Sequence, residues 1–348
     1  MSSDRAGEAA SPETGAAADE EPIFVDEMIV EDNYNGWRLD RFLTSRIRRA
    51  TRSQVRNYLG NIELEPPRRI KAGTIVRSGD VVRIIRRERI LPGVPGPEAL
   101  QILHRDAELT IISKPPGVLV HRNSREVTHT LPLYLRHHLP DAEHIEAVHR
   151  LDRETSGCML CVNRADRVAF WRAAFHDRAI RKVYVAIVTD PDGRWPEGHE
   201  ERVDIPLGPD ATSTLSLRMG HGTLRSRTDV RALGRVGELA LLELHPVEGR
   251  QHQLRAHLAL SGTPIVGDKL YEAGDDYFRR FADEPEQTMA TEPLRTPFHC
   301  LHAWRLGLSA DGVWQSWLAP LPEHMEALGG ATMARALEAR AAEPLEPR

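Results

Sequence analysis

The chain has 348 residues, of which 41% are apolar and 28% charged, and its formal net charge is −5. That length allows two domains and a sizeable core. No apolar run approaches the roughly 18 residues of a membrane span, and the first 30 residues lack the apolar core of a secretory signal. We therefore expect a cytoplasmic protein with no membrane partner. Three cysteines are too few for a disulfide framework.

The charge is distributed unevenly. Residues 1–32 carry ten acidic side chains and one basic, and they are rich in Ala, Glu and Ser, which predicts a disordered acidic tail. Residues 37–91 carry fifteen basic and five acidic side chains. Such an excess of positive charge favours a polyanionic partner. We expect a small basic domain over residues 33–91.

The basic segment has the pattern of two helices followed by two strands. Apolar residues recur at helical spacing between Arg38 and Arg48, and Ser53 suits the start of a second helix. Short strands are expected at residues 73–76 and 81–85, joined by a turn at 78–80. The segment therefore has the elements of a small α/β domain.

This order of elements resembles the small RNA-binding domain first known from a small-subunit ribosomal protein. The resemblance implies that phosphates are contacted by Arg49, Arg52, Arg56 and Lys71. The prolines at 66 and 67 stand where that domain usually has a Val-Asn-Gly hairpin, which predicts a stiffer loop. A generic basic surface is the alternative.

Three prolines and two glycines within residues 92–99 predict an interdomain linker. A second, larger domain is expected over residues 100–322, with a helical or disordered tail at 323–348. Its first strand includes residues 109–112. The Lys-Pro-Pro-Gly sequence at 114–117 predicts a sharp turn between two apolar strands, which we interpret as architectural.

The stretch His149–Gly157 places one carboxylate, Asp152, between two arginines. The apolar run Cys158–Val162 that follows predicts a buried strand. A loop carboxylate at the mouth of a sheet suits a nucleophile, and arginines nearby lower an Asp pKa by roughly 1–3 units. The alternative is an ordinary surface ion pair. Because strand positions three apart face opposite ways, Cys158 and Cys161 are expected to pack in the core rather than bind metal.

The segment Arg181–Val188 has apolar residues on both faces, which predicts a central strand. Tyr184 carries the polar tip of this strand, and a buried tyrosine hydroxyl needs a partner. A core tyrosine bonded to the backbone is one interpretation. The other is a tyrosine that faces a substrate.

A third stretch with several polar side chains is Gly249–Leu258, which follows an expected strand at 239–246. Gly262 and Pro264 end the helix predicted here, and its start offers N–H groups to a phosphate. His252 and His257 are five positions apart, a poor spacing for chelation on a helix. No metal site is expected.

Three motifs together resemble the RluA-type pseudouridine synthases, which isomerise uridine in structured RNA. They are His-Arg-Leu-Asp-x-x-Thr-Ser-Gly from residue 149, Lys-x-Tyr at 182–184 and Gly-Arg-x-His-Gln-x-Arg from residue 249. The resemblance extends from about residue 37 to residue 320. A further family stretch matches at 267–271, except that Glu272 replaces the usual glycine. The resemblance implies an α+β fold, in which a central, mostly antiparallel mixed sheet is flanked by helices.

The resemblance also implies the site. Asp152 is the catalytic carboxylate, Arg255 pairs with it, and Tyr184 packs on the target base and accepts its proton. Substrate binding is assigned to His149, Arg150, Arg153, Thr155, Arg250, His252 and Gln253. Whether Asp152 attacks the sugar, stabilises it or adds to the ring stays open.

Isomerisation involves no net redox change, so no cofactor is expected. The expected partner is ribosomal RNA, with transfer RNA as the alternative, and the chain is expected to be a monomer. A different class of function is a catalytically idle RNA-binding or ribosome-assembly factor on the same fold. A glycosidase is disfavoured, because those enzymes usually need two carboxylates at a set separation and only Asp152 is well placed.

Overall fold

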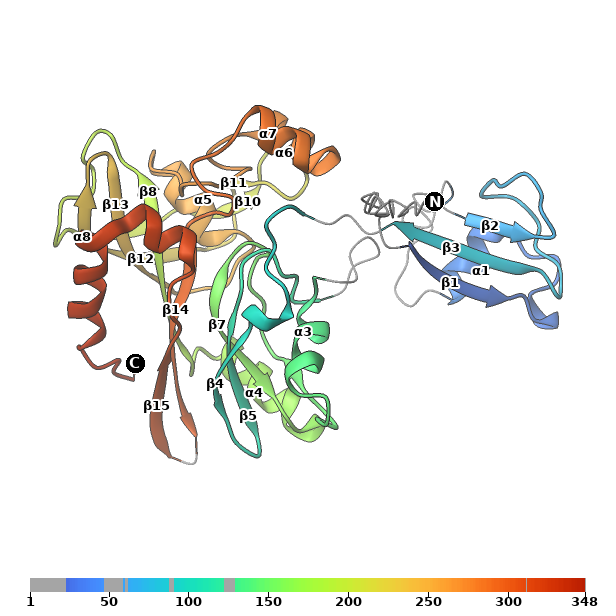
Figure 1. Ribbon diagram of the computed structural model, residues 1–348, viewed down its shortest axis with the longest axis horizontal. Helices are drawn as coiled ribbons and strands as arrows, with labels where there is room; N and C mark the ends of the chain where they lie inside the picture. Colours follow the sequence, from blue (N-terminus) through green and yellow to red (C-terminus); the bar gives the residue numbers. More distant parts are fainter. Residues whose placement is uncertain are drawn as a thin grey trace, which may run out of the picture. The chain divides into compact units, whose positions relative to one another are not determined.

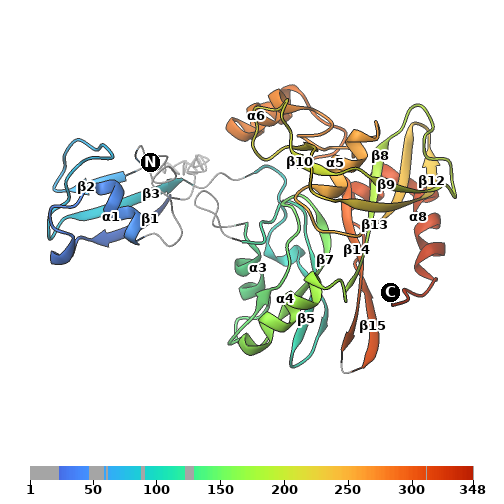
Figure 2. The ribbon, with the colours of Figure 1, turned by 180° about the vertical axis from the view of Figure 1, so that it is seen from behind.

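The computed structural model describes residues 23–46, 59, 62–87, 91–121, 129–310 and 312–347, with the backbone alone described at 23–26 and 85–87. The chain divides into two compact units, residues 1–89 and residues 90–348 (Figures 1 and 2). Each unit has its own hydrophobic core.

The first unit is built on three antiparallel strands in the order β1-β3-β2: β1 (Ile23–Ile29), β3 (Val81–Arg87) and β2 (Ile62–Glu65). The 3-10 turn η1 (Asp32–Tyr34) precedes the helix α1 (Leu39–Arg46), which buries Leu39, Phe42 and Leu43. In the loop after β2, Arg68 donates to both carboxylate oxygens of buried Asp80. This ion pair ties the proline-containing loop to the turn before β3.

Two predictions for this unit were wrong. The strand β1 lies within the predicted disordered tail and pairs with β3 along its whole length. Averaging the composition over residues 1–32 concealed the apolar residues at 23–25 and 28–30. Residues 73–76 do not form the predicted strand; they make a single bridge, between Ile75 and Arg38. Most of the predicted second helix lies outside the described residues, and so do the predicted phosphate contacts Arg49, Arg52 and Arg56.

The described part of the second unit contains a ten-stranded sheet, whose main path runs β4-β5-β7-β14-β8-β13-β12-β9. Its strands are β4 (Gln101–Arg105), β5 (Leu109–Lys114), β6 (Glu146–Ala147), β7 (Ser156–Val162), β8 (Arg181–Thr189), β9 (Glu200–Asp204), β12 (Arg227–Val236), β13 (Leu239–Pro246), β14 (Leu301–Ala310) and β15 (Val313–Leu318). β15 pairs with β14, and β6 pairs with β7. The β7–β14 pair is parallel and the other pairs are antiparallel. The predicted mixed, mostly antiparallel sheet is confirmed. The hairpin β10 (Leu207–Pro209) and β11 (Met219–His221) is separate.

Helices cover both faces of this sheet (Figures 1 and 2). They are α3 (Leu131–His138), α4 (Val168–His176), α5 (Gln253–Leu260), α6 (Asp275–Asp283), α7 (Pro285–Thr291) and α8 (Glu323–Ala341), with the 3-10 turns η3 (Pro97–Ala99) and η4 (Ala165–Arg167). Cys161 of β7 belongs to the core cluster that contains α3, and Cys158 belongs to the cluster that contains α4. Burial raises the pKa of both thiols to about 12. The predicted packing of the two cysteines on opposite faces is confirmed.

The predicted linker, residues 92–99, is instead packed within the second unit, together with Leu91. Leu91 is buried with Tyr277 and Phe281 of α6, and the carbonyl of Pro97 lies 2.9 Å from His138 Nε2. The prolines and glycines of this segment form a turn that packs on its neighbours. A high content of these residues was therefore not a sign of an exposed linker. The tail after residue 322 is the helix α8, which packs on β12 and buries Met325, Met333 and Leu337.

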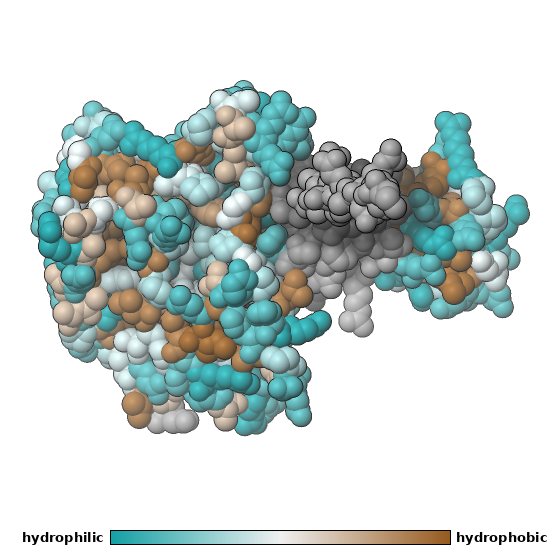
Figure 3. All heavy atoms as spheres, in the orientation of Figure 1, coloured by the Kyte–Doolittle hydropathy of each residue, from teal (hydrophilic) through white to brown (hydrophobic). Residues whose placement is uncertain are grey.

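The surface of the second unit is mixed in character (Figure 3). Large exposed apolar side chains come from separate elements, such as Phe170 on α4, Val236 on β12 and Val313 on β15. Within the described ranges, every helix is too short or too polar to cross a bilayer.

Candidate active site

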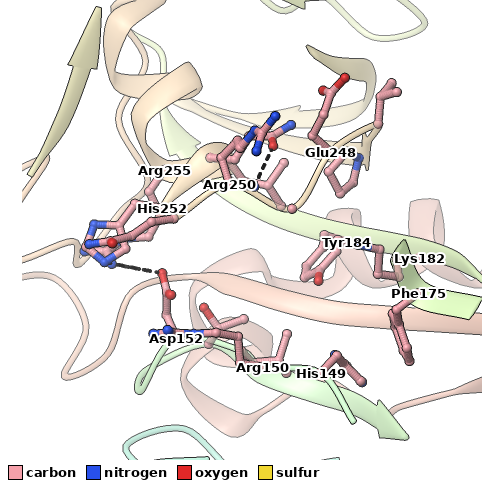
Figure 4. Close-up of a pocket in the computed structure, with 18 of the residues that line it drawn as sticks. His149, Arg150, Asp152, Phe175, Lys182, Tyr184, Glu248, Arg250, His252 and Arg255 are labelled. Carbon is pink, nitrogen blue, oxygen red and sulfur yellow. Dashed lines mark hydrogen bonds and ion pairs between the residues drawn. The ribbon is translucent and has the colours of Figure 1, made fainter. Parts of the chain in front are cut away.

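A pocket of about 570 Å³ opens where four parts of the second unit converge (Figure 4). These are the loop before β7, the segment from α4 into β8, the end of β13 and the start of α5. Small-molecule sites usually have volumes of roughly 300–1,000 Å³. The pocket thus brings together three motifs that lie far apart in the sequence.

Asp152 and Arg255 meet in this pocket. Nη1 of Arg255 donates to Oδ2 of Asp152 at 3.1 Å, and the side chains are 9% and 22% exposed for Arg255 and Asp152. Burial works to raise the pKa of Asp152, whereas nearby His252 and Arg255 work to lower it, and the net pKa lies below its ordinary value. Asp152 is therefore an ionised carboxylate at neutral pH, held by one charge-assisted hydrogen bond.

His252 lies beside this pair in a left-handed conformation, with φ of 51°. The Tyr271 hydroxyl accepts from the backbone N–H of Met219 at 2.9 Å and lies 3.2 Å from His252 Nδ1. The other ring nitrogen of His252, Nε2, is turned toward Asp152. Nε2 lies 3.9 Å from Oδ2 of Asp152. Burial and the Arg255 charge lower the pKa of His252 to about 4, so Arg255 is the permanent cation beside Asp152.

Asp268 contacts Arg255 and was not among the residues predicted for the site. Its carboxylate accepts from Nε and Nη2 of Arg255 at 2.6 and 2.9 Å, and the side chain is fully buried. Although burial opposes a charge on Arg255, Asp268 and Asp152 raise its pKa above the ordinary value. The sequence did place Asp268 in a family-like stretch, but the contact with Arg255 was visible only in three dimensions.

Tyr184 lines the pocket from β8 (Figure 4). Tyr184 is buried, with only 8% of the residue exposed, yet its hydroxyl has no hydrogen bond to any of the described residues. Burial raises the pKa of Tyr184 above its ordinary value, and the charge of Asp152 acts in the same direction. The phenol is therefore neutral at neutral pH. This geometry does not fit a core tyrosine bonded to the backbone.

The other predicted substrate-binding residues are used in different ways. Arg150 and Arg250 are exposed on the pocket rim. His149 stacks on Phe175 with ring centroids 4.3 Å apart, and its Nε2 accepts from the backbone of Leu160 at 3.0 Å. Burial lowers the pKa of His149 to about 3, so this imidazole is a neutral part of the pocket wall.

Gln253 lines the pocket, but its amide is committed to the protein. The amide oxygen accepts from the backbone N–H of Arg250 at 3.1 Å, and the amide nitrogen donates to the carbonyl of Arg227 at 2.9 Å. Gln253 therefore fixes the loop before α5, which also carries His252.

Arg153 is not among the pocket-lining residues, and its Nε donates to the carbonyl of Gly117 at 3.0 Å. Thr155 lines the pocket and lies 2.9 Å from Nε2 of His299. Behind them, Lys269 donates to Glu154 at 2.9 Å. These contacts fix the loop that carries Asp152.

Lys114, the first residue of the turn at 114–117, holds the same loop in place. Its buried Nζ donates to three carbonyls, those of Pro115, Val118 and Arg153, each at 2.9 Å. Burial lowers the pKa of Lys114 to about 7, and the charge of Asp152 opposes this. The architectural interpretation of this turn fits these contacts.

Lys182 and Arg178 also line the pocket and were not predicted as site residues. Lys182 lies two positions before Tyr184 on the same strand, so the Lys-x-Tyr spacing was a usable signal. Among the described residues, no three His, Cys, Asp or Glu side chains are grouped to hold a metal ion.

The family model of RNA pseudouridylate synthase matches residues 108–260 of this chain. Ribosomal large subunit pseudouridine synthase C of Vibrio cholerae is 30% identical over 72% of this chain and 80% of its own length. The enzyme of the same name from Salmonella typhi is 30% identical over 80% of this chain and 86% of its own. Ribosomal large subunit pseudouridine synthase D of Nitrosomonas europaea is 28% identical over 92% and 91%.

Among solved structures, human RNA pseudouridylate synthase domain containing 4 matches with a TM-score of 0.48 and 25% identity, covering 71% of this chain and 95% of that one. The chain therefore belongs to the RluA-type RNA pseudouridine synthases, and its mixed sheet is the pseudouridine synthase fold that the sequence predicted.

Proposed function

We propose that this enzyme isomerises uridines of large-subunit ribosomal RNA and that Asp152 is its reacting carboxylate. The observation that carries the proposal is the pairing of Asp152 with Arg255 at 3.1 Å, inside an open pocket that Tyr184 also lines. The names of the curated relatives support large-subunit RNA as the substrate.

The reaction breaks the bond between C1′ and N1 of uridine and forms a bond between C1′ and C5. The hydrogen on C5 leaves as a proton, and N1 ends with a hydrogen. Attack at the sugar, stabilisation of the sugar and addition to the ring all require a carboxylate at the junction of base and ribose. Asp152 supplies this carboxylate, and Arg255 keeps it ionised and aimed.

Tyr184 provides a ring face for the uracil and a hydroxyl for proton transfer. A neutral phenol accepts the C5 proton only as it gives up its own, and N1 of the base, which ends with a hydrogen, is the final acceptor. This hydroxyl therefore acts as a relay rather than as a free base. The lack of a partner for the hydroxyl among the described residues supports this role.

The pocket rim carries cationic side chains, which are Arg150, Arg178, Lys182 and Arg250. A uridine must leave its stack to reach Asp152, at a cost of a few kcal/mol, and contacts to phosphates offset that cost. In the first unit, the exposed Lys71 adds to the basic surface predicted to bind RNA, together with Arg49, Arg52 and Arg56. We also infer a monomer, because one chain supplies Asp152, Tyr184 and Arg255, and a cytoplasmic location, where the proposed ribosomal substrate is found.

Mapping pseudouridines by carbodiimide modification and reverse transcription tests the substrate. We expect at least one pseudouridine of large-subunit RNA to vanish when the gene is deleted. It should return with the wild-type gene and not with the Asp152→Asn variant. If all large-subunit sites persist and sites in transfer RNA vanish, the assignment to ribosomal RNA is wrong.

A further inference from the structure

We propose that Asp268 is a positioning residue for the isomerisation, because it fixes Arg255 so that a single guanidinium nitrogen faces Asp152. This inference rests on the proposed function, since it gives Asp268 a task in the same reaction. Asp268 does not line the pocket, so it acts through Arg255 and not on the RNA.

The guanidinium of Arg255 is divided between two carboxylates. Asp268 takes the edge formed by Nε and Nη2, at 2.6 and 2.9 Å, and Asp152 receives Nη1 alone, at 3.1 Å. The planar guanidinium fork matches a carboxylate through two parallel hydrogen bonds. Because Asp268 occupies the edge formed by Nε and Nη2, Arg255 is held against rotation, and in this orientation Nη1 is the guanidinium nitrogen that reaches Asp152.

Asp268 is itself held on a rigid turn. Its Oδ1 accepts the backbone N–H groups of Leu270 and Tyr271, each at 3.0 Å. The preceding Gly267 has φ of 79°, and a Cβ there would lie 2.7 Å from the carbonyl oxygen of Phe298. Glu272, which replaces the usual glycine, accepts the Gly267 N–H at 2.6 Å. The carboxylate of Asp268 therefore has little freedom to move.

This arrangement leaves Asp152 charged but lightly held. Within the described part of the chain, its carboxylate accepts one hydrogen bond, on Oδ2, and the side chain is 22% exposed. A bidentate ion pair would stabilise the ground state of Asp152 and would have to break before reaction. In the orientation that Asp268 imposes, Arg255 bonds Oδ2 alone, so that Oδ1 of Asp152 stays available to the substrate.

The test is Asp268→Asn in the full-length enzyme. Asparagine keeps the shape and an oxygen for the two backbone N–H groups, but it loses the charge that holds Arg255. RNA that carries tritium at C5 of uridine releases it to water as pseudouridine forms, which gives a single-turnover rate. We expect this rate to fall about 100-fold while the RNA dissociation constant changes less than about twofold.

Asp190→Asn is the matched control. Asp190 is also fully buried, pairs with Arg235 and accepts the backbone N–H groups of Arg194 and Trp195 at 2.8 and 3.0 Å, but it does not line the pocket. It should lose stability by a similar amount and keep its rate. If Asp268→Asn matches this control in rate, or loses RNA binding as much as rate, the positioning role is overturned.

If Asp268→Asn does not fold, a second variant, Arg255→Lys, tests the proposal. Arg255→Lys keeps one positive charge beside Asp152 but has no planar fork for Asp268 to hold. We expect a decrease in rate of similar size, about 100-fold. A rate within about threefold of wild type would overturn the proposal, because charge alone would then suffice. If wild-type enzyme releases no tritium, the proposed substrate fails instead.

Discussion

Arg255 donates a hydrogen bond of 3.1 Å to Asp152, although 103 positions separate the two residues in the chain. The contact joins the loop before β7 to the first turns of α5. It places a permanent cation beside a carboxylate in a partly water-excluded pocket, where charge interactions are stronger than in water. The charge state of Asp152 therefore controls the reaction.

The first prediction concerns the acid side of the pH–rate profile. Arg255 favours the ionised form of Asp152, and the pKa of Asp152 is below its ordinary value, so activity should persist as pH falls to about 4. Arg255→Gln removes the positive charge, favours the protonated acid and should move the acid limb to higher pH. Single-turnover tritium release across the acid range measures this. Arg255→Lys keeps the charge, so its acid limb should stay at the pH of the wild-type enzyme. An acid limb at the wild-type pH in Arg255→Gln would contradict a role for the charge.

The second prediction concerns the hydroxyl of Tyr184. Tyr184→Phe keeps the ring face and removes the proton relay, so kcat should fall by about 10²–10⁴-fold with little change in KM. Tyr134→Phe is the control, because the Tyr134 hydroxyl donates to the carbonyl of Pro95 and lies outside the pocket. That control should lose about 1 kcal/mol of stability and no activity. Equal rates for the two variants would rule out the relay.

The third prediction concerns the acid stability of the second unit. Nε and Nη2 of Arg340 on α8 donate to Glu243 of β13 at 2.7 and 3.0 Å. Burial works to raise the pKa of Glu243, but hydrogen bonds from His245 and Arg340 lower it to about 2. A lowered pKa stabilises the fold above the ordinary glutamate pKa, here by about 3 kcal/mol, and this contribution disappears as pH falls towards 2.

Thermal unfolding of Arg340→Gln as a function of pH measures this contribution. The variant should be less stable than wild type at neutral pH, and the two unfolding temperatures should converge as the medium becomes acidic. Arg335 is exposed on the same helix and has no ion pair to the described residues, so Arg335→Gln should follow wild type. A constant gap between Arg340→Gln and wild type would show that Glu243 ionisation is not responsible.

The fourth prediction concerns the first unit as an RNA anchor. Removing residues 1–89 takes away the basic segment and leaves Leu91 in its place beside α6. The RNA dissociation constant should rise, and its dependence on salt should weaken by a slope of about 0.7–0.9 for each phosphate that the first unit neutralises. Filter binding over a salt series measures both quantities. A salt slope equal to that of the full chain would remove this unit from the RNA interface.

The central residues of the site could be predicted from the sequence because each motif contains a residue whose chemical role is recognisable from its neighbours in the chain. Asp152, Tyr184 and Arg255 line one pocket, as expected from three separate motifs. The conformation of His252 and the contact between Asp268 and Arg255 depend on how α5 and the turn at 267–271 pack together. Periodicity and spacing within one segment carry no information on that packing.

The misplaced elements have a similar cause. The strand β1 depends on pairing with β3, which lies more than 50 residues later, so its short apolar run was outweighed by acidic neighbours. Residues 91–99 have the composition of a linker but are held by contacts to α3 and α6. Tertiary contacts decided both outcomes.

The most direct test of the account is the single-turnover release of tritium by Asp152→Asn. The substitution keeps the size and the hydrogen-bond acceptor of the side chain and removes its charge. We predict that release slows by at least about 10⁴-fold, while RNA binding stays within about twofold of wild type. Turnover within about tenfold of wild type would contradict the account, because the reaction would then proceed without the carboxylate on which it depends.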